Sequence, residues 1–287
     1  MIPTSKTIRN FSRMDNIKII FFGNGPLADY ALAALKRSGC EIIFHAKTKS
    51  DLETVKKTKF LHPEAHGVLA SFGVIIKKDV LDLFEPEGIL NIHPSPLPKY
   101  RGPSPIETAI LNGDTTISVS VMKLVPEMDA GPVYFVLSCS FDENTPKDEI
   151  YHTLATRAVE QMIKHIRLAE LICPLPQKGK PSYTHKFDKS MSPLDPKRKN
   201  AKKLHNQVRA FAGFPKSKYE FFGIDCTIIS AHVATDEEKT AIKAKNTALL
   251  SIRCYDGSFL IVDEIQPAGR KIMDAKSFIN GYGKNKS

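Results

Sequence analysis

Four short apolar runs in the first third of the chain constrain its fold more than any other feature, because none of them alternates with polar residues. They lie at 17–22, 41–44, 67–71 and 88–92. Between the first two, residues 27–38 repeat apolar side chains at the period of a helix. Strands without polar alternation are typical of a parallel sheet that helices cover on both faces. The first part of the chain is therefore predicted to be an α/β domain.

Further elements extend this first part. Short helices are expected at 79–84 and 105–112, and a long amphipathic helix is expected at 148–173. Strands are expected at 118–124, which alternates, and at 133–138. All of these elements precede a marked change in composition.

The change is a proline-rich segment. Residues 174–181 contain three prolines and one glycine and have no apolar period, which is typical of a linker beside a domain end. One helix is expected beyond it, at 201–211. Several short strands with turn residues between them follow and suggest a small barrel; they lie at 218–222, 226–233, 248–253 and 258–266.

We therefore expect four parts: an N-terminal tail (1–15), a first domain (16–174), a linker (175–188) and a second domain (189–287). The tail is basic and lacks the apolar centre of a secretory signal. Two alternatives for it are an organelle transit peptide and a true start at Met14 rather than Met1.

Composition excludes several classes of protein. No apolar run approaches the roughly 18 residues that span a bilayer. The five cysteines are odd in number and form no C-x-x-C pair, which argues against a disulfide framework or a zinc site. We expect a cytoplasmic chain with reduced thiols, no membrane contact and no bound metal.

Charge is distributed unevenly along the chain. Residues 1–174 carry equal numbers of basic and acidic residues, whereas residues 189–287 carry 18 Lys and Arg against 10 Asp and Glu. A basic second domain fits nucleic acid phosphates or another anionic surface. From charge alone, a merely soluble basic face explains it equally well.

The densest chemical signal lies at the end of the fourth predicted strand. Asn91 and His93 are two residues apart, so the period of a strand puts both side chains on one face. Ligands of open α/β sheets bind at the carboxyl ends of the strands. A rigid proline-rich loop, 94–105, follows, and Asp129 lies in a later turn between two strands.

These three residue types suit the attack of an amine on a carbonyl carbon. An amide can donate to an oxyanion, an imidazole can donate or move a proton near neutral pH, and a carboxylate can orient the imidazole. No serine or cysteine nucleophile is needed. Each residue taken singly is also a common turn or strand-end residue, so spacing alone leaves the chemistry open.

The motifs together resemble the hallmark of the folate-dependent formyltransferases. The matching positions are Asn91-x-His93-x-Ser95-x-Leu97-Pro98, then Arg101-Gly102, then Met128-Asp129-x-Gly131-Pro132, with 71–76 similar to a preceding strand-end segment. In the second part, 208–211 with Pro215 and 266–271 resemble the C-terminal domain of the branch of that family that acts on methionyl-tRNA. The resemblance runs from about Ile17 to about Ile279.

The resemblance implies a Rossmann-like parallel sheet followed by a small OB-like β-barrel. It implies transfer of a formyl group from 10-formyltetrahydrofolate to the amino group of initiator methionyl-tRNA, for translation initiation, by a chain that we expect to be a monomer. The catalytic positions would be Asn91, His93 and Asp129, and the folate loop would comprise Ser95, Pro96, Leu97 and Pro98. We expect Asn91 and His93 to hold the formyl oxygen while Asp129 orients His93 and helps to remove the amine proton.

Ten basic residues are candidates for contact with the nucleic acid: Lys47, Lys49, Arg101, Lys197, Arg198, Lys202, Lys203, Arg209, Arg270 and Lys271. The sequence departs from the family in two places. Pro96 stands where the family usually has leucine, and 47–59 is a short lysine-containing loop where the family has a longer basic one.

Other interpretations remain open at this point. The acceptor could be a sugar amine, or the chain could be an RNA-binding protein that has lost catalysis. Gly23-x-Gly25 could indicate a dinucleotide site, although the third glycine is missing. His62 and His66 have metal-ligand spacing, but Pro63 disfavours the helix that would bring them together.

Overall fold

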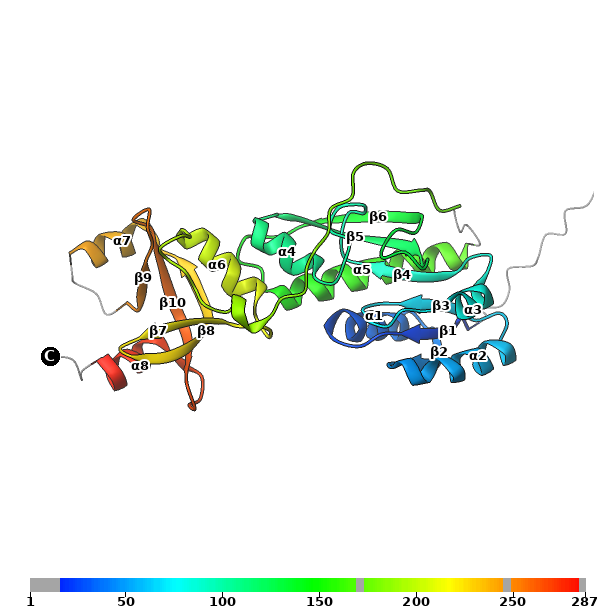
Figure 1. Ribbon diagram of the computed structural model, residues 1–287, viewed down its shortest axis with the longest axis horizontal. Helices are drawn as coiled ribbons and strands as arrows, with labels where there is room; N and C mark the ends of the chain where they lie inside the picture. Colours follow the sequence, from blue (N-terminus) through cyan, green and yellow to red (C-terminus); the bar gives the residue numbers. More distant parts are fainter. Residues whose placement is uncertain (1–15, 169–172, 245–248, 284–287) are drawn as a thin grey trace, which may run out of the picture.

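The computed structural model describes residues 16–168, 173–244 and 249–283, whose strands form one six-stranded and one five-stranded sheet (Figure 1). We call the two parts built on these sheets the first and second modules. The predicted N-terminal tail, and residues 169–172 of the long predicted helix, lie outside the described residues. None of the described helices combines the length and apolar character that crossing a bilayer requires.

The sheet of the first module has the strand order β2-β1-β3-β4-β5-β6. The first four strands are parallel, as predicted, whereas β5 and β6 run antiparallel to their neighbours. Antiparallel neighbours need only a short connection, and nine residues join β5 to β6. The strands are β1 (Lys18–Phe22), β2 (Glu41–Ala46), β3 (His66–Leu69), β4 (Ile89–His93), β5 (Thr116–Lys123) and β6 (Val133–Ser140).

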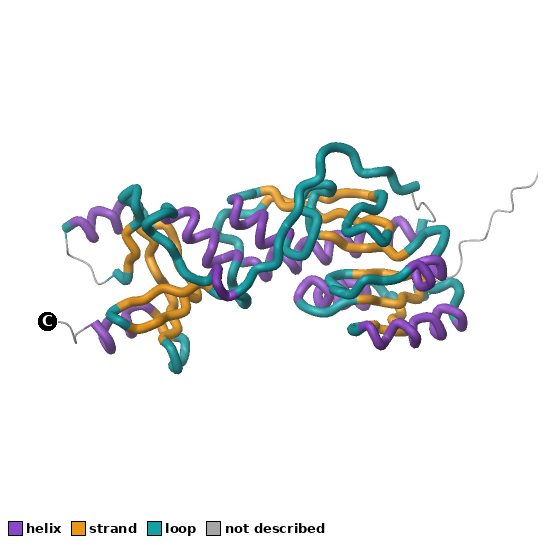
Figure 2. The backbone as a smooth tube through the Cα atoms, viewed as in Figure 1, coloured by secondary structure: helices purple, strands orange, loops and turns teal. Residues whose placement is uncertain are grey.

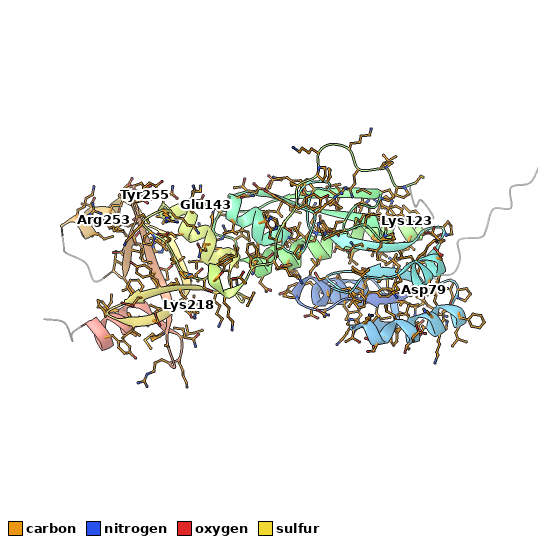
Figure 3. All side chains as sticks on the ribbon, viewed as in Figure 1. Asp79, Lys123, Glu143, Lys218, Arg253 and Tyr255 are labelled. Atoms are coloured by element: carbon orange, nitrogen blue, oxygen red, sulfur yellow. The ribbon has the colours of Figure 1, made fainter. Side chains whose placement is uncertain are left out.

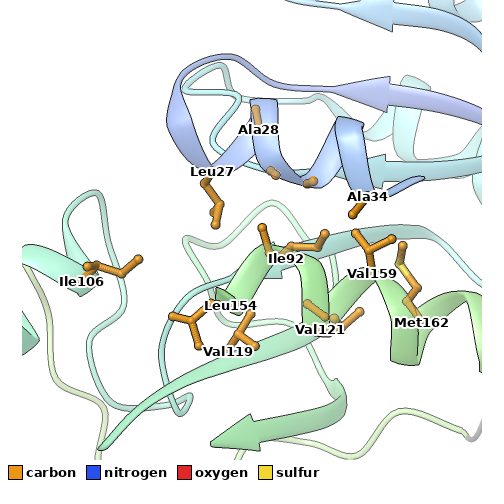
Figure 4. Close-up of a cluster of buried hydrophobic side chains, with 14 of the residues drawn as sticks. Leu27, Ala28, Ala34, Ile92, Ile106, Val119, Val121, Leu154, Val159 and Met162 are labelled. Atoms are coloured by element: carbon orange, nitrogen blue, oxygen red, sulfur yellow. The ribbon is translucent and has the colours of Figure 1, made fainter. Parts of the chain in front are cut away.

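Helices cover both faces of this sheet. Ile19 and Phe21 of β1 enter one core with α1 (Pro26–Arg37), α4 (Pro105–Asn112) and α5 (Lys147–Arg167), part of which Figure 4 shows. The residues that alternate with them, Ile20 and Phe22, enter the opposite core with α2 (Leu52–Leu61), α3 (Lys78–Leu81) and the 3-10 turn η2 (Asp82–Phe84). Burial on both faces explains why the strands carry no polar alternation.

Helix α2 corrects the prediction of a lysine-containing loop at 47–59. The segment begins with the 3-10 turn η1 (Lys49–Asp51) and continues as helix. Val55 is fully buried, and the ammonium group of Lys59 donates to the carbonyl oxygens of Pro63 and Ala65 at 2.7 and 2.6 Å. Burial lowers the pKa of Lys59. This lysine is therefore part of the packing.

The sheet of the second module has the order β11-β10-β8-β7, with β9 paired to β10, and every pairing is antiparallel. Its strands are β7 (Ser217–Phe221), β8 (Ile224–Val233), β9 (Ser251–Arg253), β10 (Phe259–Pro267) and β11 (Met273–Asp274). Helix α6 (Ala201–Ala210) was predicted, whereas α7 (Asp236–Lys243), α8 (Ala275–Tyr282) and the 3-10 turn η3 (Lys189–Met191) were not. Leu204 and Val208 of α6 pack with Phe278 of α8 in its core.

The two modules are joined through α6. Phe211, just after this helix, is buried in the core of the first module. Lys147 donates to the Ala210 carbonyl oxygen at 2.8 Å, and Lys202 pairs with Glu143 at 2.8 Å. Figure 3 marks Glu143 where the first module meets the second. These contacts hold both ends of α6 against the first module.

One ionic cluster makes the stability of the second module depend on pH. His232 on β8 lies 2.9 Å from Asp263 on β10 and 3.1 Å from Glu238 on α7. Partial burial lowers the pKa of His232, but hydrogen bonds to the two carboxylates outweigh it, so the pKa lies above its ordinary value. The stabilisation is therefore present below about pH 6.5 and is lost as the pH rises through the raised pKa.

We predict that His232→Gln lowers the melting midpoint more at pH 6 than at pH 9, as measured by differential scanning calorimetry. Buried His205, whose pKa burial lowers to about 4, is neutral in the folded protein at both pH values. Equal losses at the two pH values would contradict the assignment.

Candidate active site

Strand β4 ends in two buried polar residues. Asn91 and His93 are about 5% and 6% exposed. Within the described part of the chain, the side-chain amide of Asn91 makes no hydrogen bond, although buried side-chain amides are normally paired. An amide that touches solvent at a strand end and has no protein partner is available to a ligand.

His93 is held from both sides of its ring. Nε2 lies 3.0 Å from the carbonyl oxygen of Tyr100, which can only accept, so Nε2 carries the hydrogen. Nδ1 lies 3.7 Å from the Asp129 carboxylate. The structure thus brings His93 and Asp129 together, as expected. It also shows that the Nε2–H of His93 is already used by the protein.

Asp129 sits in the turn between β5 and β6 with a φ of 48°. Its carboxylate accepts a hydrogen bond of 2.7 Å from the backbone N–H of Gly102. The side chain is 16% exposed. One oxygen therefore anchors the residue to the proline-rich loop, while the other faces the imidazole.

The proline-rich loop is held by serine hydroxyl groups, one in the loop itself and one on β5. Ser95 Oγ donates to the Lys99 carbonyl at 2.7 Å, and Ser120 Oγ donates to the Ser95 carbonyl at 2.6 Å. Leu97 is buried and donates its N–H to Ser120 Oγ. The Ser95 hydroxyl is therefore committed to the loop, and Pro96 and Pro98 are the partly exposed members of the predicted folate loop.

Comparison with known proteins identifies the family. Residues 18–166 match the family described as Formyl transferase, and residues 187–283 match the one described as Formyl transferase, C-terminal domain. The chain belongs to the formyl transferase family. This confirms the predicted resemblance to the formyltransferases.

Relatives of this formyltransferase cover both modules. The methionyl-tRNA formyltransferase of Thermus thermophilus is 30% identical over 261 residues, which are 90% of this chain and 82% of that protein. That of Methylococcus capsulatus is 33% identical over 247 residues, covering 84% and 78%. The similarity therefore includes the basic second module as well as the first.

Two solved structures share the fold. A methionyl-tRNA formyltransferase from Clostridium thermocellum has a TM-score of 0.61 at 19% identity, covering 77% of this chain and 94% of that one. HypX from Aquifex aeolicus, in complex with tetrahydrofolic acid, has a TM-score of 0.70 at 16% identity and is covered over 48% of its length, against 94% of this chain. These matches confirm the Rossmann-like sheet followed by a separate antiparallel module.

The basic candidates of this formyltransferase fall into two groups. Most have exposed side chains: Lys47, Lys49, Lys197, Arg198, Lys202, Lys203, Arg270 and Lys271. Arg101 and Arg209 are partly buried and are used inside the protein. Arg101 donates twice to Gln177 Oε1, and Arg209 donates twice to the Thr145 carbonyl, at 2.8 and 3.3 Å. Part of each guanidinium is therefore already bonded within the protein.

Sequence reasoning missed three residues near these sites. Tyr255 is 62% exposed and donates its backbone N–H to the Pro196 carbonyl. Tyr255 and exposed Arg253, the last residue of β9, therefore lie near the loop that carries Lys197. Gln177, in the predicted linker, contacts the Asp129 turn. No local period marks any of the three, because their positions depend on loops that meet only in the fold.

The alternative sites have structural explanations. A Cβ on Gly23 would lie 2.0 Å from the Ala70 carbonyl oxygen, so close packing of β1 against β3 requires this glycine without any nucleotide. Lys18 Nζ lies 3.3 Å from His62 Nδ1, which places a cation where a metal would bind. Among the described residues, no group of three or more His, Cys, Asp or Glu side chains could hold a metal ion.

We predict that Arg209→Ala destabilises the formyltransferase by about 2 kcal/mol, because it removes charge-assisted hydrogen bonds at the module junction. Thermal unfolding should show a midpoint lower by roughly 5 °C. Lys203→Ala, on the exposed side of the same helix, is the matched control and should leave the midpoint unchanged. Similar melting of both variants would contradict a structural role for Arg209.

Proposed function

We propose that this formyltransferase transfers the formyl group of 10-formyltetrahydrofolate to the amino group of initiator methionyl-tRNA, in the cytoplasm and as a monomer. The observation that carries the proposal is the free Asn91 amide beside the His93–Asp129 pair at the end of β4. The choice of acceptor is supported by relatives named methionyl-tRNA formyltransferase that match both modules.

The proposed chemistry begins with a neutral amine. It attacks the formyl carbon, a C–N bond forms, and the formyl oxygen becomes an oxyanion that the Asn91 amide stabilises by donating a hydrogen bond. His93 can add a second donor only through Nδ1 of a protonated imidazolium or after a turn of its ring, because the Tyr100 carbonyl holds its Nε2–H and Nδ1 of the neutral ring has no hydrogen.

Asp129 handles the proton in this scheme. Its carboxylate fixes the imidazole and accepts the proton from the attacking amine, directly or through a water. When the intermediate collapses, the bond from the formyl carbon to the folate nitrogen breaks, and that nitrogen takes the proton. In this scheme Pro96 and Pro98 border the folate. The hydrogen bonds of the Ser95 hydroxyl and the Leu97 N–H hold this part of the loop in place.

The proposed organisation assigns residues 16–174 to catalysis, 175–188 to the connection and 189–287 to an OB-like tRNA-binding domain. Exposed Lys197, Arg198 and Lys203 would contact phosphates, and Tyr255 beside them offers a face on which a base can stack. An open cavity of about 760 Å³ lies between the modules, lined by Pro103 and Ser104 of the proline-rich loop and by Phe214.

The decisive experiment compares acceptors. Purified protein with labelled 10-formyltetrahydrofolate should formylate methionyl-tRNA and leave uncharged tRNA unlabelled, because only the charged form carries the amine. A nucleotide-linked amino sugar serves as the third acceptor. Labelling of the amino sugar in preference to methionyl-tRNA would replace the proposed acceptor, and labelling of neither would overturn formyl transfer to both.

We predict that Asn91→Ala lowers kcat by a factor of about 10² to 10³, the usual effect of removing one oxyanion donor. Asp129→Ala should also reduce kcat strongly while circular dichroism shows an intact fold. Both are measured by single-turnover formylation of methionyl-tRNA. Near-normal rates in either variant would remove that residue from the proposed mechanism.

A further inference from the structure

The segment between the two modules is bound along its length to the loops of the active site. We call residues 174–184 the strap; it lies in the teal loop that leads from the first sheet toward the second module (Figure 2). At one end Leu175 and Val133 exchange backbone hydrogen bonds of 2.8 and 2.9 Å. At the other, Thr184 donates its N–H to the Arg101 carbonyl at 2.7 Å. The strap therefore contacts both the start of β6 and the proline-rich loop, unlike the free linker that its composition predicts.

Gln177 is the side chain at the centre of the strap. Its Nε2 donates to the carbonyl oxygens of Asp129 and Gly131, both at 2.8 Å. Its Oε1 accepts from Arg101 Nε and Nη2 at 3.1 and 2.6 Å. A primary amide has two hydrogens to donate and two lone pairs to accept with. Every hydrogen-bonding position of Gln177 is thus used, and all of them serve residues in the two active-site loops.

These bonds close a ring around the carboxylate of Asp129. Gln177 holds the backbone of Asp129 on one side and the side chain of Arg101 on the other. The residue after Arg101, Gly102, donates its N–H to Asp129 Oδ2 at 2.7 Å. Any movement of Gln177 would therefore affect Asp129 in two ways. It would change the hydrogen bond to the Asp129 carbonyl, and through Arg101 it would shift the Gly102 N–H that donates to the Asp129 carboxylate.

The conformation of Asp129 explains why such support is needed. Its φ of 48° lies in the left-handed region, which residues other than glycine adopt only when surrounding contacts hold them there. Gln177 bonds to the carbonyl oxygens of Asp129 and Gly131, which belong to this same turn. The remaining oxygen of Asp129 is 3.7 Å from His93, a separation that a small shift of the turn would change.

We propose that Gln177 is a positioning residue that holds the Asp129 carboxylate against His93 and ready to accept the proton of the acceptor amine. The catalytic part of this role rests on the proposed function. The support that Gln177 gives to the Asp129 turn can be measured without any acceptor. Gln177 acts through Asp129 and takes no direct part in the transfer.

The first test uses Gln177→Met, which preserves length and removes every hydrogen bond, and Gln177→Glu, which keeps an acceptor for Arg101 but loses both donors to the turn. Lys178→Met, at an exposed neighbouring position of the strap with no described partner, is the control. Both Gln177 variants should lower kcat by about 10- to 100-fold, since small misplacements of reacting groups cost this much. The KM values for folate and for charged tRNA should change less than about threefold. A kcat equal to that of Lys178→Met would overturn the proposal.

A double variant separates positioning from general damage. If Gln177 acts through Asp129, Gln177→Met should cause no further loss of kcat once Asp129→Ala is present, because the group to be positioned is gone. A structural defect would instead multiply the two losses, and that result would overturn the proposal.

Amide hydrogen exchange gives a readout that needs no catalysis. In Gln177→Met, the Gly102 amide should exchange at least about tenfold faster than in the wild type, because its acceptor is no longer held, while the amides of β4 should keep their rates. An unchanged Gly102 rate would overturn the proposal even if the wild type does not formylate methionyl-tRNA. A wild type that is inactive on that acceptor, with faster Gly102 exchange in the variant, would overturn the proposed function alone.

Discussion

The hydrogen bond from the Gly102 N–H to the Asp129 carboxylate is the contact on which the arrangement of the active site depends. It joins two loops that start from different strands, one after β4 and one between β5 and β6. With one oxygen fixed in this way, the other faces His93. The same loop carries the Tyr100 carbonyl that holds the far side of the imidazole. The Gly102 N–H and the Tyr100 carbonyl oxygen thus determine the positions of the Asp129 carboxylate and the His93 imidazole.

The junction between the modules extends this support outward. The strap follows the active-site loops before the chain enters the second module, and α6 then returns to the first module through Lys147, Arg209 and Phe211. A basic module attached at two places holds a more constant position relative to Asn91 than a flexible linker would allow. A macromolecular acceptor with a distant recognition surface and a single reacting amine gains from such a fixed separation, because less freedom is lost on binding.

Several elements were predictable because burial leaves a pattern in the sequence. The first four strands of the large sheet are buried on both faces, so their apolar runs are unbroken. Helix α2 left little pattern, because Val55 is its one buried apolar residue and its other buried residue is Lys59. The strap left none, since it is held by hydrogen bonds of backbone groups and of the Gln177, Ser182 and Thr184 side chains, and such bonds require no apolar period. Arg209 was predicted to contact phosphate because its sequence neighbours are basic. Its partner Thr145 is far away in the chain, so the sequence did not reveal their hydrogen bonds.

The sequence by itself determined the family and the α/β character of the first module, and it yielded the prediction that Asn91, His93 and Asp129 are the catalytic residues. These depend on residue types and on spacing within single strands and loops. Only the tertiary structure decided that Ser95 and Arg101 are bound within the protein, that Gln177 supports Asp129, and which basic residues remain exposed. The physical reason is that these roles depend on contacts between loops distant in sequence. A hydrogen bond to a backbone carbonyl can be formed with any residue that the fold brings near, so its partner cannot be read from the side chains alone.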